Sequence, residues 1–175
     1  MEGMDERYPI GKFNYDGEIS TDVLQDWINK IEELPERLRK AIEHLKDEQL
    51  DTPYRKDGWT IRQVVHHLAD SHMNAFIRLK LALTEESPVI KPYDETEWAE
   101  LTDSALSVES SLLILTGLHH RWANLLQSLS PTDLEKLFVH PELGEVPIKQ
   151  NIGMYAWHSN HHLAHITNLC KQMDW

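Results

Sequence analysis

Apolar side chains recur every third or fourth residue along four long stretches of the chain, a spacing that is typical of helices with one buried face. The four stretches cover residues 20–45, 60–83, 108–129 and 149–173. Ser20 and Thr60 stand where the first two begin, and their hydroxyl groups suit helix N-caps. Pro35 interrupts the first stretch, so the pattern predicts a kink or a break there.

The segments between these stretches are polar or rich in proline and glycine. Residues 47–58 and 86–95 are predicted loops, and a short helical turn is expected after Pro131. Residues 138–148 are predicted to be extended, with a turn near Gly144. The sequence therefore predicts an all-α fold, a four-helix bundle with short extended segments in its loops, as one domain over residues 1–175. The loop after Leu83 is long, so up-down-up-down connections are not assured.

Composition excludes several classes of protein. The formal charge of −12, from 17 basic and 29 acidic side chains, argues against binding to nucleic acid or anionic membranes. No apolar run approaches the roughly 20 residues of a membrane helix, and the N-terminus lacks the apolar core of a signal peptide. The single cysteine, Cys170, fits a reducing compartment. We therefore expect a cytoplasmic globular protein.

Histidines are unevenly placed, and four of them fall within "WHSNHHLAHI", residues 157–166. They form two pairs at helical spacing, His158 with His162 and His161 with His165. On a helical wheel His158 and His162 extend the apolar stripe, whereas His161 and His165 fall toward the polar side. The arithmetic favours His158 and His162 as the inward pair.

Two imidazoles four residues apart can bind one metal ion, although the same spacing also suits a hydrogen-bonded polar patch between helices. A third ligand would come from the second helix, in "VVHHLADSH". His67 lies at the edge of the apolar face there, His72 lies within it, and His66 points away. Periodicity leaves the choice between His67 and His72 open, and His72 also suits a hydrogen-bonded core histidine.

Two longer segments carry a family resemblance. "GWTIRQVVHHLADSHMN" and, about ninety residues later, "YAWHSNHHLAHI" resemble the DinB-like superfamily and are most similar to its YfiT branch. "YPIGKF", "LDTPYR" and "KPYDE" are similar to that branch as well. The resemblance implies a four-helix bundle, one divalent metal per chain held by His67, His158 and His162, and a homodimer. Members of the branch are labelled metal-dependent hydrolases, and the branch includes bacillithiol transferases.

Three neutral imidazoles leave at least one coordination position open, which is typical of catalytic sites. A cation there lowers the pKa of a bound water, or equally of a substrate thiol. We therefore predict a metal-dependent hydrolase acting on a small molecule. The alternatives are a thiol S-transferase that conjugates bacillithiol or a similar low-molecular-weight thiol to electrophiles, and a non-enzymatic metal-binding module. Zinc is the expected metal, with nickel as the other candidate.

Other residues are candidates for supporting roles, and none is assigned as the catalytic acid or base. Asp70 could accept a hydrogen bond from a ligand imidazole, or could be a solvated carboxylate. Tyr155 and Arg78 could orient a substrate, although these residue types are more often core and surface. His161 and His165 are further candidates near the metal. Cys170 is expected to pack in the core.

Overall fold

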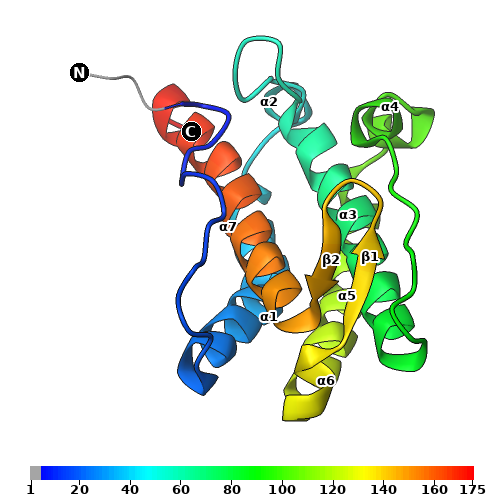
Figure 1. The fold of residues 1–175 in the computed structure, drawn as a ribbon. Helices are drawn as coiled ribbons and strands as arrows, with labels where there is room; N and C mark the ends of the chain where they lie inside the picture. Colours follow the sequence, from blue (N-terminus) through cyan, green and yellow to red (C-terminus); the bar gives the residue numbers. More distant parts are fainter. Residues whose placement is uncertain (1–4) are drawn as a thin grey trace.

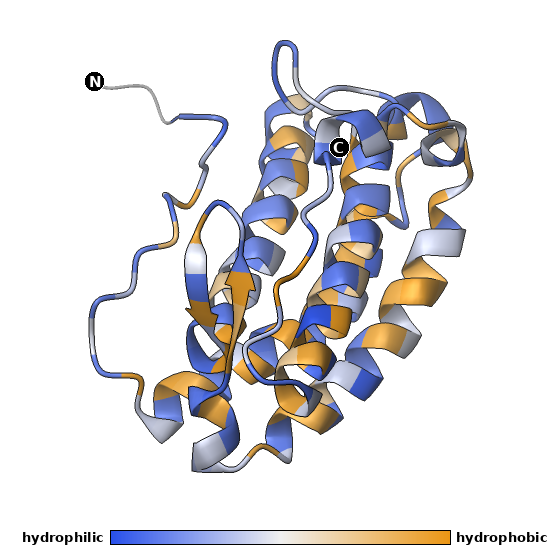
Figure 2. Ribbon diagram, turned by 45° about the vertical axis from the view of Figure 1, so that its right-hand side comes forward, coloured by the Kyte–Doolittle hydropathy of each residue, from blue (hydrophilic) through white to orange (hydrophobic). Residues whose placement is uncertain are grey.

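A computed structural model describes residues 5–175 of the chain and confirms the predicted four-helix bundle (Figure 1). The four long helices are α1 (Thr21–Ile42), α3 (Ile61–Thr84), α5 (Val108–Gln127) and α7 (Ile148–Met173). Their buried residues are mainly apolar, and the hydropathy colouring of the ribbon in Figure 2 shows hydrophobic and hydrophilic residues alternating along each helix. Within the described residues, none of these helices combines the length and the apolarity needed to cross a membrane.

The predicted helix starts are confirmed by their capping hydrogen bonds. The Ser20 hydroxyl accepts from the backbone N–H of Val23 at 3.3 Å. The Thr60 hydroxyl accepts from the N–H of Gln63 at 3.1 Å, and the Gln63 side chain accepts from the N–H of Thr60 at 3.0 Å. This reciprocal capping box fixes the first turn of α3. His67 lies one turn further along the same helix.

Pro35 does not break α1, which runs without interruption from Thr21 to Ile42. Because proline has no N–H, the carbonyl of Ile31, four residues earlier, lacks its usual partner within the helix. The Nδ1 atom of His119 on α5 lies 2.5 Å from that carbonyl oxygen and donates to it. A hydrogen bond from a neighbouring helix thus replaces the missing one.

The helices are not connected in simple up-down-up-down order. α1 and α3 each pack against both α5 and α7, so α1 and α3 lie diagonally across the bundle. His66 contacts Ser111 and His72 contacts His119, so α3 and α5 run in the same direction. The long connection between them must return along the bundle, as its length suggested.

Short elements occupy the connections. The prediction missed α2 (Asp47–Leu50), α4 (Glu95–Ala99) and the 3-10 helix η1 (Thr102–Ala105), which are one or two turns long and have no extended apolar period. The helical turn α6 (Pro131–Glu135) and the extended segments β1 (Leu137–His140) and β2 (Gly144–Pro147) confirm the prediction. The strands pair antiparallel, and Gly144 takes a positive φ of 77° at the turn.

The core consists of two apolar clusters. One is built around Ile31, Ala75 and Trp122, and the other around Leu34, Leu68 and Leu115. His72 and His119, both with 0% exposure, fall between them in the order of residues along α3 and α5. The bundle interior therefore contains a buried polar layer, and this layer adjoins the histidines of α7.

Candidate metal centre

Three imidazoles from two facing helices meet at one point of the bundle. His67 on α3 and His158 and His162 on α7 each place a ring nitrogen within 4.8 Å of the others. The Nε2 atoms of His67 and His158 are 3.3 Å apart. These are the three residues that the family resemblance implied, and the structure brings them together.

The distance between two of these nitrogens fits a tetrahedral divalent ion. Metal–nitrogen bonds of about 2.0–2.1 Å at the tetrahedral angle separate two ligand nitrogens by roughly 3.3–3.4 Å. The separation of the Nε2 atoms of His67 and His158 is 3.3 Å. The donor set is entirely imidazole, which suits zinc or nickel better than magnesium or calcium. The residues present therefore fit a transition-metal ion.

His161 and His165 are buried, although the helical wheel placed them toward the polar side. Their exposed fractions are 7% and 3%. Tyr54 stacks on the ring of His165 at 4.0 Å, and Tyr8 lies against His161 at 5.8 Å between ring centroids. The N-terminal segment, which Figure 1 shows beside α7, and the loop after α2 cover a face that one helix alone would leave to solvent.

These two residues form a second histidine group with one member of the first. Ring nitrogens of His161, His162 and His165 lie within 4.8 Å of one another. His162 therefore belongs to both groups. The Nδ1 atoms of His162 and His165 are 3.3 Å apart, and His165 Nε2 donates to the carbonyl of Arg7 at 3.2 Å.

His72 is a hydrogen-bonded core histidine, which resolves the alternative left open on the second helix. Its Nε2 lies 3.0 Å from Nδ1 of His158, and its Nδ1 lies 2.7 Å from Nε2 of His119. His72 thus stands behind the group of three, whereas His67 belongs to it. His66 points away from this group, as predicted, but toward α5 and not to solvent: it is buried, with Nδ1 2.6 Å from the Ser111 hydroxyl and Nε2 3.0 Å from the Leu106 carbonyl.

Burial keeps these imidazoles neutral at pH 7. Desolvation lowers the pKa of His67 to about 3, with His161 and His165 adding to the effect. Desolvation lowers the pKa values of His161 and His165 to about 4 and those of His158 and His162 well below the usual range. Neutral rings have a free lone pair, so the group is ready to bind a cation.

Two pockets open on either side of His158. One, of about 490 Å³, also exposes the rings of His67 and His162 and is bordered by Arg7 and Arg55. The other, of about 600 Å³, is lined by Arg78, Tyr93 and Tyr155. Glu95 lines both pockets. Tyr155 and Arg78 therefore lie beside the ligand group, where they can contact a substrate, while Cys170 is buried at the far end in the apolar cluster around Leu68.

Asp70 lies away from the imidazoles. Among residues 5–175 no hydrogen bond joins its carboxylate to a histidine, and it lines neither pocket beside His158. Partial burial, with a smaller contribution from Asp103, raises the pKa of Asp70 to about 6. The proposed role as hydrogen-bond acceptor for a ligand is therefore not supported by its position.

Glu95 is a pocket residue that sequence reasoning missed. It is the first residue of α4, which Asp94 caps by accepting from the N–H groups of Thr96 and Glu97. One carboxylate oxygen lies 3.9 Å from Nε2 of His67. Desolvation, with a smaller contribution from Asp94, raises the pKa of Glu95. The segment "KPYDE" had only contributed to the resemblance, because a carboxylate in an acidic loop carries no positional signal of its own.

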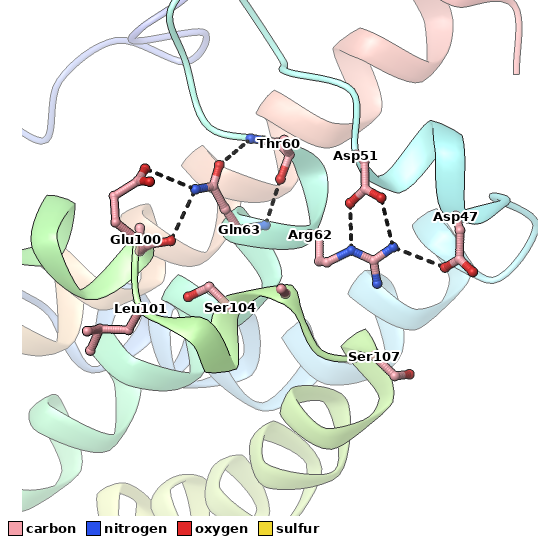
Figure 3. Close-up of a pocket in the computed structure, with 11 residues that line it drawn as sticks. Asp47, Asp51, Thr60, Arg62, Gln63, Glu100, Leu101, Ser104 and Ser107 are labelled. Carbon is pink, nitrogen blue, oxygen red and sulfur yellow. Dashed lines mark hydrogen bonds and ion pairs between the residues drawn. The ribbon is translucent and has the colours of Figure 1, made fainter.

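A larger pocket, of about 640 Å³, lies near the start of α3 and contains no histidine (Figure 3). Arg62 projects into it and donates to Asp51 at 2.6 Å, to Asp47 at 3.0 Å and to the Leu106 carbonyl at 3.3 Å. Gln63 donates to Glu100 and to the Ala99 carbonyl. These hydrogen bonds attach the neighbouring loops to α3. Because the polar groups bind one another, the pocket offers a ligand few free donors.

Several known proteins are similar to this chain over nearly its whole length. A protein of Oceanobacillus iheyensis, named "Putative metal-dependent hydrolase", is 62% identical over 98% of this chain and 100% of its own length. One of Bacillus mycoides with the same description is 58% identical over 98% and 99%.

Two solved structures share the fold. YfiT from Bacillus subtilis, described as "a probable metal-dependent hydrolase with an unusual four-helix bundle topology", superposes with a TM-score of 0.94. It is 49% identical and covers 97% of this chain and 98% of its own. The four-helix bundle protein TT2238, at 20% identity and a TM-score of 0.57 over 80% and 94%, supports the fold alone. The family model of the DinB superfamily matches residues 30–166, and the chain belongs to this superfamily.

Proposed function

We propose that this protein is a metal-dependent enzyme, a hydrolase of a small molecule, with one Zn²⁺ per chain bound by His67, His158 and His162. The observation that carries the proposal is the convergence of three neutral ring nitrogens within 4.8 Å at the wall of a pocket. Nickel is the second candidate, because imidazole ligands suit both ions.

The open side of the ligand group supports a catalytic role over a structural one. Structural zinc sites are closed by four protein ligands, whereas catalytic sites keep a position for water or substrate. Here the three rings supply three nitrogens, and the pocket of about 490 Å³ lies against them. A divalent ion held there would lower the pKa of a bound water to about 7 and polarise a substrate oxygen.

The residues around the pockets have distinct tasks in this proposal. Glu95 lies close enough to His67, at 3.9 Å from its Nε2, to accept a proton from a water in the pocket. Arg78 and Tyr155 offer hydrogen-bond donors from the other side of His158 and can hold a polar group of the substrate. Trp59, whose ring lies 4.6 Å from that of His67, covers the ligand with an apolar surface.

Thiol S-transfer is the second candidate function, and the arginines of the pocket favour it. Arg7 and Arg55 border the pocket beside the ligands, and Nε of Arg55 is buried without a hydrogen-bond partner among the described residues. Guanidinium groups bind carboxylates well, so they suit a thiol substrate that carries one. The same ion would lower the pKa of such a thiol.

Metal analysis of the purified protein tests the proposal first. We expect one divalent ion per chain after zinc reconstitution, its loss in His158→Ala, and its retention in His161→Ala, the matched variant from the second histidine group. A wild-type protein that binds no stoichiometric divalent ion would overturn the proposal. Metal-dependent cleavage of small esters and amides, compared with thiol-dependent consumption of a model electrophile, then separates hydrolase from transferase.

Stripping the metal separates both enzymes from a non-enzymatic module. The core is built from two apolar clusters that do not need the ion. We therefore expect activity to disappear with a chelator while the helical content and most of the stability persist. Unfolding of the chelated protein would instead indicate a structural ion.

A further inference from the structure

A row of hydrogen-bonded imidazoles leads from the backbone of α1 to the ligand His158. It begins at the Ile31 carbonyl, which accepts from Nδ1 of His119 at 2.5 Å. Nε2 of His119 lies 2.7 Å from Nδ1 of His72, and Nε2 of His72 lies 3.0 Å from Nδ1 of His158. His72 and His119 line neither of the pockets beside His158, so the proposed chemistry does not use them directly.

The backbone end of this row determines the direction of every hydrogen bond. A carbonyl oxygen can only accept, so the single proton of a neutral His119 ring is on Nδ1 and its Nε2 is an acceptor. His72 must then donate from Nδ1, which makes its own Nε2 an acceptor. His158 must in turn donate from Nδ1. The lone pair of His158 is therefore on Nε2, the atom that faces His67 at 3.3 Å.

Pro35 explains why the row can start where it does. In an uninterrupted helix the carbonyl of Ile31 would accept the N–H of residue 35. Proline has none, and His119 of the neighbouring helix donates a side-chain hydrogen bond to this carbonyl instead. Because of the proline in the middle of α1, the Ile31 carbonyl can serve as a buried acceptor for the row of imidazoles that reaches His158.

The second α7 ligand is held in the same way from the other side. The Arg7 carbonyl accepts from Nε2 of His165 at 3.2 Å, so a neutral His165 has its lone pair on Nδ1. Nδ1 of His162 lies 3.3 Å away and must donate to it. The lone pair of His162 is then on Nε2, as for His158.

We propose that His119 and His72 are positioning residues that fix the Nδ1–H tautomer of His158, and that His165 does the same for His162. Both α7 imidazoles then present Nε2 lone pairs toward one cation. The inference rests on the proposed metal site and deepens it. A ligand imidazole is commonly oriented by a hydrogen-bond acceptor for its other nitrogen, often a carboxylate or a carbonyl. Here a second imidazole is the acceptor. Its own tautomer is fixed, directly or through another ring, by a backbone carbonyl.

Nitrogen NMR of the metal-free protein tests the tautomers directly. We expect long-range 1H–15N correlations of protein labelled at histidine, in the presence of a chelator, to show Nδ1–H for His119, His72, His158 and His162 and Nε2–H for His165. Single His→Gln variants assign the signals. An Nε2–H tautomer at His119 or His158 would overturn the proposal. This measurement needs no bound ion, so it stands even if the protein fails to bind zinc.

Zinc affinity of His119 variants tests the consequence. His119→Phe fills the space but breaks the row, and we expect it to raise the Kd for Zn²⁺ by about 10–100-fold, the usual effect of losing a supporting hydrogen bond behind a ligand. His119→Gln keeps a donor and an acceptor and should stay within about threefold of wild type. His120→Phe, at the exposed neighbouring position, is the matched control and should bind as wild type.

The outcomes separate this inference from the proposed function. If wild type binds zinc and a folded His119→Phe binds it equally well, the positioning role is wrong while the metal site stands. If His119→Gln is as weak as His119→Phe, the effect comes from packing and the positioning role is again wrong. Should His119→Phe not fold, as judged by circular dichroism, the tautomer measurement on the wild type decides.

Discussion

The pocket at Arg62 and the pocket at His67 lie on the same helix, five residues apart, yet they differ in how their polar groups are satisfied. Arg62 is 8% exposed, and its donors meet two carboxylates and a carbonyl. His67 is 4% exposed, and its Nε2 faces the Nε2 of His158, an atom of the same kind. The polar groups of the Arg62 pocket are paired with groups of opposite hydrogen-bonding character, whereas the His67 pocket brings imidazole nitrogens together.

This contrast shows why pocket size alone does not select a candidate metal site. The Arg62 pocket is larger, at about 640 Å³ against about 490 Å³. Buried polar groups are normally paired, so pairing within the protein is what a structural role predicts. Several neutral imidazoles that converge at the wall of a pocket are instead the arrangement expected of a site that binds a cation.

Removing a ligand should produce the largest effect. We expect His67→Ala to raise the Kd for Zn²⁺ by about 10³-fold, since one of three ligands accounts for roughly a third of a binding free energy of about 10–16 kcal/mol. Competition with a chromophoric chelator measures it. Urea unfolding of the metal-free variant and of metal-free wild type checks that the loss of affinity does not come from a loss of the fold. A loss of under tenfold would mean that the ion is held by the second histidine group.

Lowering the pH should reduce the stability that depends on neutral buried histidines and should leave Arg62 charged. Burial lowers the pKa of His119 to about 4 from an ordinary 6.5, so its contribution to stability is complete above pH 6.5 and is lost as the pH falls toward 4. The loss amounts to about 3 kcal/mol at about 1.4 kcal/mol per pH unit. Arg62 stays protonated throughout this range. Urea unfolding of metal-free protein at pH 7 and pH 4 measures the total loss.

The contribution of His119 to that loss is measured by comparing how far the free energy of unfolding falls in wild type and in a His119 variant. His119→Gln cannot take up a proton, so its free energy of unfolding should fall by about 3 kcal/mol less than that of wild type between these pH values. His120→Gln provides the control. Equal falls in wild type and His119→Gln would contradict the assignment of a buried neutral ring.

Removing the side chain of Arg62 should lower the free energy of unfolding and leave metal binding intact. Arg62→Ala removes a buried guanidinium that joins α3 to the α2 segment, and we expect a loss of about 2 kcal/mol in the free energy of unfolding. The Leu106 carbonyl keeps its bond from His66, which limits the damage. The Kd for Zn²⁺ should change by less than about twofold. A tenfold weakening in the folded variant would show that the two pockets are coupled.

Hydrophobic periodicity was sufficient to predict the long helices and the inward position of His158 and His162, because these depend on one helix at a time. It failed for His161 and His165, since the residues that bury them, Tyr8 and Tyr54, lie more than a hundred positions away along the chain. Only the family resemblance selected His67 over His72. Both rings are buried, so the apolar sector of one helix cannot separate a candidate ligand from a hydrogen-bonded core histidine.

His119 was missed although the sequence contains a signal for it. It stands four residues after Leu115 and three before Trp122, in the middle of the apolar stripe of α5. A polar ring at such a position needs a buried partner. The missing N–H of Pro35 supplied a free carbonyl, but connecting the two required knowledge that α1 and α5 are neighbours.

The smallest expected effect concerns Asp70, which belongs to neither pocket. Its raised pKa of about 6 means that the folded protein disfavours the ionised carboxylate, so stability declines as the pH rises from about 3.8 to 6. Asp70→Asn removes the charge and should raise the free energy of unfolding at pH 7 by about 1 kcal/mol, a value discounted for partial exposure. The Kd for Zn²⁺ should stay within about twofold, since no hydrogen bond in the described residues links this carboxylate to His67. A tenfold weaker Kd would return Asp70 to the role of supporting a ligand and would mean that the contrast between free and paired groups on α3 is incomplete.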